Sequence, residues 1–77
     1  MMNVGQTLSH QHLEAAVVEV LPQFGLAYVA DRDDRTWAVT RATQGSGIDT
    51  LQAGQRLLLD VETHPSFSIV CRYETLN

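Results

Sequence analysis

Hydrophobic and polar side chains alternate along most of this chain, and turn residues divide the alternation into short segments. The clearest case is residues 56–62, where Leu57, Leu59 and Val61 fall on one face of an extended strand. Leu58 falls on the opposite face. Residues 67–74 alternate in the same way, which predicts a shared face for Phe67, Ile69, Cys71 and Tyr73 and an outward-facing Val70.

Five segments of this kind are separated by turn signals such as Pro22 and the charged run DRDD at residues 31–34. The segments are residues 13–21, 25–30, 35–40, 56–62 and 67–74. Short strands at this spacing are typical of an all-β barrel. The first segment fits a helical stripe as well as a strand, so periodicity alone leaves both open. Residues 1–12 are polar and lack a period, which predicts a flexible N-terminal arm before one domain at residues 13–77.

The second and third segments predict a hairpin that carries large apolar side chains. Alternate side chains of a strand share a face, so Leu26 and Tyr28 should lie together, as should Trp37 and Val39. If these four side chains shared one face of the hairpin, they would form a platform of the kind that holds single-stranded nucleic acid on small barrels. The opposing interpretation is that Tyr28 and Trp37 only stabilise the hairpin as cross-strand aromatic residues.

Composition sets limits on the partners of the chain. Its 77 residues make one domain, and the formal charge of −4 argues against strong general affinity for phosphate. The basic residues are five arginines with no lysine, and most of them have acidic neighbours. Cys71 is the only cysteine, which excludes an internal disulfide. The N-terminus lacks signal-peptide features and no apolar run is long enough to cross a membrane, so we expect a cytoplasmic protein.

The chain shows no catalytic motif. The pair His10 and His12 has the spacing of two metal ligands on one strand, but no third ligand is near it in the sequence. The acidic run at residues 31–34 lacks the glycine and distal glutamate of a calcium loop. Residues 45–47 lack the lysine of a phosphate-binding loop. We therefore expect no enzyme activity, no metal and no cofactor.

Three motifs resemble those of the bacterial cold-shock proteins. The run QGSGIDTLQAGQ at residues 44–55 resembles the family pattern Q-G-x-G-x-x-T-L-x-x-G-Q, found between its third and fourth strands. Residues 25–29, GLAYV, stand where the family carries its first RNA-binding motif, G-F-G-F-I. Residues 37–40, WAVT, stand where it carries its second, F-V-H-F. The resemblance covers residues 15–76 and implies a five-stranded antiparallel OB-fold barrel, with residues 13–21 as its first strand.

The same resemblance implies single-stranded RNA or DNA as the ligand. Its implied contact residues are Phe24, Leu26, Tyr28, Arg35, Trp37, Val39 and Arg41. Several family positions have changed: Glu19 replaces a tryptophan, Phe24 a lysine, Leu26 a phenylalanine, Val39 a histidine and Thr40 a phenylalanine. Each stacked base contributes roughly 1–3 kcal/mol, so these losses predict weak binding with little base specificity.

A different class of function is also open. The acidic charge, Glu19 on the family's binding face, and outward-facing Leu58 and Val70 favour a protein-interaction or structural module. Such a module would keep the barrel without binding nucleic acid, and its apolar face could drive formation of a homodimer.

Overall fold

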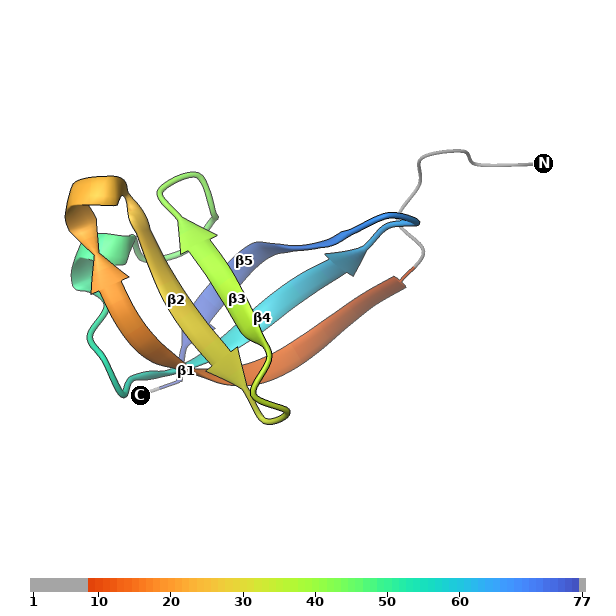
Figure 1. Ribbon diagram of the computed structural model, residues 1–77, viewed down its shortest axis with the longest axis horizontal. Helices are drawn as coiled ribbons and strands as arrows, with labels where there is room; N and C mark the ends of the chain where they lie inside the picture. The colour runs from red at the N-terminus through yellow and green to blue at the C-terminus, as the bar shows by residue number, and fades with distance from the viewer. Residues whose placement is uncertain (1–8, 77) are drawn as a thin grey trace.

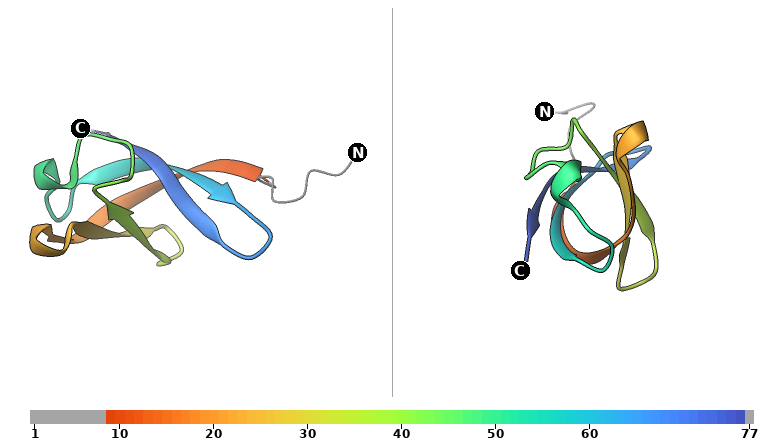
Figure 2. Two further views of the ribbon diagram at one scale, coloured as in Figure 1. Left: turned by 90° about the horizontal axis from the view of Figure 1, so that it is seen from above. Right: turned by 90° about the vertical axis from the view of Figure 1, so that its left-hand side faces the viewer.

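The computed structural model describes residues 9–76 as five antiparallel strands that curl into a half-barrel (Figures 1 and 2). The strands are β1 (Ser9–Leu21), β2 (Leu26–Asp31), β3 (Thr36–Thr40), β4 (Arg56–Thr63) and β5 (Ser68–Thr75). Short 3₁₀ turns η1 (Pro22–Phe24) and η2 (Ile48–Thr50) follow β1 and precede β4. The all-β prediction is confirmed, and the ambiguous first segment is a strand. Within residues 9–76, no helix has the length and apolar character needed to span a membrane.

Strand β1 holds the sheet together because it pairs on both sides, giving the order β3-β2-β1-β4-β5. Its first half pairs with β4 and its second half with β2. A register shift between Val17 and Glu19 forms a bulge between the halves, and bulges of this kind sharpen the twist of a sheet. Residues 9–12, predicted as part of the flexible arm, are strand because they pair with residues 60–63 of β4. The rest of that predicted arm lies outside the described residues.

The core fills the concave side of the curled sheet. Leu57, Leu59 and Val61 are buried there, as their alternation predicted. Ile48 and Leu51 enter from the connection between β3 and β4 and close one end of the core. The other buried side chains are Ala15, Val17, Ala27, Val29, Trp37, Val39, Val70 and Tyr73. All buried residues among those described are hydrophobic, so apolar burial is the main stabilising term.

The edge strands β3 and β5 approach each other where the half-barrel closes (Figure 2). Gln44, just beyond β3, forms a parallel bridge with Arg72 of β5. The backbone N–H of Tyr73 donates to the carbonyl of Gln44 at 2.9 Å, and the N–H of Gln44 donates to Cys71 at 3.4 Å. These bonds fasten the loop after β3 to the last strand.

The predicted faces of residues 67–70 are wrong, because Phe67 and Ile69 are exposed and Val70 is buried. Asp60 pairs with Arg72 and Val61 pairs with Val70, so Cys71 is an extra residue in β5. One extra residue reverses the faces of all that follow. Val70 and Tyr73 therefore both point into the core, so Tyr73 is buried as predicted, whereas Val70 was predicted to face outward.

Candidate nucleic-acid interface

The hairpin of β2 and β3 divides the predicted platform between two faces. Trp37 pairs with Val29, whereas Tyr28 pairs with Ala38. Trp37 is 8% exposed and Val39 is fully buried, so both belong to the core. Tyr28 is 37% exposed on the outer face. The prediction of one platform carrying both rings is wrong, because cross-strand partners share a face and Trp37 is paired with the buried Val29.

Asp31 explains how the indole of Trp37 is accommodated inside. The Trp37 Nε1–H donates to the Asp31 carboxylate at 3.0 Å, which supplies the partner that a buried indole needs. The same carboxylate accepts the backbone N–H groups of Asp33 and Arg35. The guanidinium of Arg35 lies 4.7 Å from the centre of the Trp37 ring. Arg35 therefore packs on the turn that holds Trp37 in place.

These hydrogen bonds lower the pKa of Asp31, with the bond from Trp37 as the largest cause. A lowered folded-state pKa gives stability that is present above the ordinary aspartate pKa and lost as pH falls through the folded value. We expect Asp31→Asn to be less stable than the wild type at neutral pH and to lose less stability on acidification below about pH 4. Urea unfolding followed by Trp37 fluorescence at several pH values measures this. Equal pH slopes for the two proteins would show that Asp31 contributes nothing to acid unfolding.

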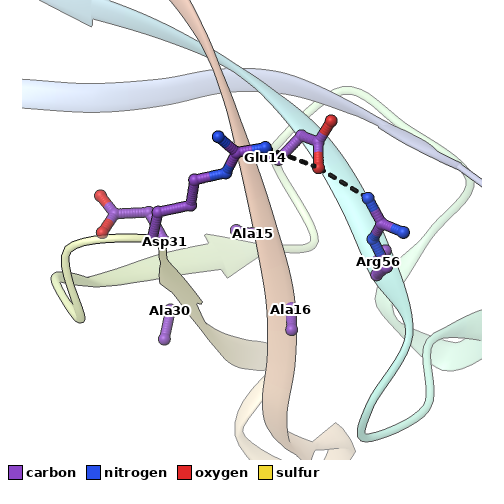
Figure 3. Close-up of a pocket in the computed structure, with 7 residues that line it drawn as sticks. Glu14, Ala15, Ala16, Ala30, Asp31 and Arg56 are labelled. Atoms are coloured by element: carbon purple, nitrogen blue, oxygen red, sulfur yellow. Dashed lines mark hydrogen bonds and ion pairs between the residues drawn. The ribbon is translucent and has the colours of Figure 1, made fainter.

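A shallow groove of about 340 Å³ lies on the outer face where β1 meets β2 (Figure 3). Ala16 and Ala30 are directly paired across the two strands and form part of its floor. Arg32 and Arg56 stand on its rims. Their side chains are 83% and 57% exposed, so both guanidinium groups reach solvent. The groove is open because its alanine side chains leave room that larger residues would fill.

Glu14 lies between the two arginines. Its carboxylate accepts a hydrogen bond from Arg56 Nη2 at 2.7 Å and lies 3.9 Å from Arg32 Nη2. Figure 3 shows Glu14 and Arg56 joined across the top of the groove. The bond from Arg56 is the main cause of a lowered pKa at Glu14, so this carboxylate stays ionised and neutralises part of the basic rim. Asp31 also lines the groove, so its two arginines are balanced by two carboxylates.

Tyr28 extends the outer face beyond the groove, two residues along β2 from Ala30. Its direct cross-strand neighbour on β1 is Glu19, which is exposed. Val18 at the bulge and Phe24 in η1 are more than half exposed nearby in the chain. Leu26 is half-buried on this face. The outer face of β2 thus carries the ring of Tyr28 and the side chain of Leu26 beside the carboxylate of Glu19.

Arg41 is engaged within the chain. Its guanidinium donates to the Asp49 carboxylate at 3.0 Å and to the Pro22 carbonyl at 2.8 Å. It thereby ties η1 to η2 at the closed end of the half-barrel. Of the predicted contact residues, Leu26 and Tyr28 share the outer face and Phe24 is exposed in η1, whereas the others lie in the core or are held in internal contacts.

Sequence reasoning missed the groove. Its rims come from Glu14 on β1, Arg32 after β2 and Arg56 on β4, and Glu14 and Arg56 are 42 positions apart. Alternation along residues 13–21 places Ala16 on an outward face. No local sequence pattern, however, indicates that this segment pairs with both β2 and β4. Comparisons of the chain with protein families, with curated proteins and with solved structures found no match.

Proposed function

We propose that the outer face of β1 and β2 binds single-stranded RNA or DNA weakly and with little base specificity. One observation carries the proposal: the ring of Tyr28 lies two residues along β2 from a groove rimmed by the exposed guanidinium groups of Arg32 and Arg56. Arginine suits phosphate because its fork donates two parallel hydrogen bonds. A base stacked on Tyr28 would place its neighbouring phosphates over the groove. The chain is on this account a binding protein rather than an enzyme.

The charges around this face explain why the proposed binding is weak. Glu14 occupies part of the basic rim, Glu19 stands beside Tyr28, and the chain carries a net charge of −4. One stacked base contributes roughly 1–3 kcal/mol. We expect a Kd of about 10⁻⁴ M or weaker at physiological salt, at the weak end of non-specific binding.

We further propose that the barrel belongs to the OB-fold group and resembles the cold-shock domains. The strand order β3-β2-β1-β4-β5 supports this, since closing β3 against β5 gives a partly open five-stranded barrel. The parallel bridge between Gln44 and Arg72 lies at that closure. The glycine-bearing motif at residues 44–55 forms the loop that caps the core with Ile48 and Leu51.

Fluorescence anisotropy of a labelled single-stranded oligonucleotide at low salt tests the proposed interface. Tyr28→Ala should weaken binding roughly 5- to 150-fold, which corresponds to about 1–3 kcal/mol of lost stacking. Each phosphate contact with a single strand contributes about −0.7 to the slope of log K against log salt concentration, so two contacts predict a slope near −1.4. The double variant Arg32→Ala, Arg56→Ala should lose most of this salt dependence. Phe67→Ala is the matched control, because Phe67 is equally aromatic, 54% exposed and at the β4–β5 turn.

Self-association is the second candidate, and the exposure of Phe24 favours it. Phe24 is 70% exposed and, with Val18 and Tyr28, gives this face an apolar surface suited to a second copy of the chain. Sedimentation of the purified chain separates the two candidates. A dimer that Phe24→Ser dissociates, together with no oligonucleotide binding at high micromolar protein, would replace the nucleic-acid proposal. A monomer that binds the oligonucleotide would support it.

A further inference from the structure

A second cluster of reactive side chains lies on β1, β4 and β5. It includes His10 at the start of β1, whereas the cross-strand neighbour of Tyr28, Glu19, lies near the end of that strand. Figure 1 shows the start of β1 beside the end of β4, with β5 next to them. Asp60 and Glu62 alternate on β4 and so share one face. His10 pairs directly with Glu62. The bulge in β5 turns Cys71 toward the same group of side chains.

The side-chain atoms of this cluster are close together. His10 Nδ1 lies 2.9 Å from Asp60 Oδ1, and His10 Nε2 lies 3.6 Å from Glu62 Oε2. One ligand atom from each of His10, Asp60 and Cys71 lies within 4.8 Å of the other two. The thiol of Cys71 donates to the Asp60 backbone carbonyl at 3.2 Å. Three side chains with metal-ligating atoms thus converge from three strands, and Glu62 faces the Nε2 side of the His10 ring.

The donor types match a zinc ion better than a hard cation. An imidazole nitrogen, a thiol sulfur and carboxylate oxygens are the three ligand classes that zinc accepts in tetrahedral sites. Calcium and magnesium prefer oxygen alone. The carboxylates of Asp60 and Glu62 beside His10 also attract a cation electrostatically.

The geometry needs only a small contraction to reach a tetrahedron. Bonds of about 2.0–2.3 Å to zinc place neighbouring ligand atoms about 3.4 Å apart. The side chain of His10 is 52% exposed, so it can rotate toward the ion while the half-buried Asp60 stays fixed. His64 Nε2 lies 3.2 Å from Glu62 Oε1, a contact that orients the Glu62 carboxylate from behind.

We propose that His10 Nδ1, Asp60 and Cys71 form a binding site for one zinc ion that joins β1, β4 and β5, with Glu62 facing the other ring nitrogen of His10. The site is separate from the proposed nucleic-acid interface and does not rest on it. Of the two histidines noted in the sequence, His10 is a ligand. His12 is not a ligand, because it lies outside the group of converging ligand atoms. Bound zinc would fasten the first residues of β1 to the sheet.

Titration of the full chain, prepared without a histidine tag, with Zn²⁺ and with Co²⁺ tests the site. We expect one equivalent of zinc by calorimetry, a higher melting temperature, and a near-ultraviolet thiolate-to-cobalt absorption band. Cys71→Ser should abolish that band, and His10→Gln should weaken zinc binding about 10-fold or more. His12→Gln is the matched control, because His12 lies on the same strand two residues away, and it should bind as the wild type does.

Each other result would overturn the proposal. Absence of zinc binding at high-micromolar metal would do so, as would a cobalt complex that lacks the thiolate band. Equal losses in the His10 and His12 variants would show diffuse binding to surface histidines. Circular dichroism of the metal-free variants verifies that they fold, and His10→Gln changes an exposed residue, so at least one variant reports on the site without disturbing the core.

Discussion

Replacing Leu59 with alanine is expected to destabilise the fold by about 2–5 kcal/mol, the largest effect of any single truncation considered for this chain. Leu59 is fully buried at the middle of β4, which pairs with β1 on one side and β5 on the other. Its removal leaves a cavity that the paired strands cannot collapse to fill. A domain of 77 residues has roughly 4–12 kcal/mol of total stability, so the variant should be partly or wholly unfolded.

Urea unfolding followed by Trp37 fluorescence measures this loss. Leu58→Ala is the matched control, because Leu58 is the preceding residue of β4 and lies half-buried on the outer face. We expect a clearly smaller loss for that variant. Equal losses at the two positions would contradict the placement of Leu59 in the core.

The second large effect is expected at Gly45, where alanine should cost about 1–3 kcal/mol through overpacking. A Cβ atom at this position would lie less than 3.0 Å from three atoms of the Tyr73 ring. The ring is buried, and its hydroxyl accepts the Gly47 N–H at 2.8 Å, so it has no free direction in which to move. The loop after β3 would have to shift and weaken the bonds between Gln44 and β5.

Thermal unfolding of Gly45→Ala alone and on a Tyr73→Leu background isolates this contact. Leucine lacks the ring atoms that the new methyl group would meet, so the added cost of Gly45→Ala should shrink on that background. Ser46→Ala, in the same loop, is the control for general loop effects and should change the melting temperature little. An unchanged cost on the leucine background would place the strain elsewhere.

The strands follow from the sequence because each one alternates over several residues and ends at a turn signal. Residues 56–62 are the clearest example, since a single register buries three aliphatic side chains. Prediction failed where an extra residue interrupts the alternation. The bulge at Cys71 places Val70 on the same buried face as Tyr73, although strict alternation separates them, and a bulge depends on the partner strand.

The candidate site was predicted in part, for a related reason. Tyr28 and Leu26 reach the outer face as expected, but Trp37 does not, because it pairs with the inward-facing Val29 and not with Tyr28. The sequence also contains no sign that Asp31 would hold the indole inside. Arg32 and Arg56 become neighbours of Glu14 only through the pairing of β1 with both β2 and β4.

Amide NMR spectra of the chain, titrated with a single-stranded oligonucleotide at low salt, test most directly whether the outer face of β1 and β2 is the binding surface. The account predicts shifts concentrated at Ala16, Tyr28, Ala30 and Arg56, with residues 67–71 unchanged. Shifts confined to the β4–β5 end, or none at high micromolar oligonucleotide, would contradict it.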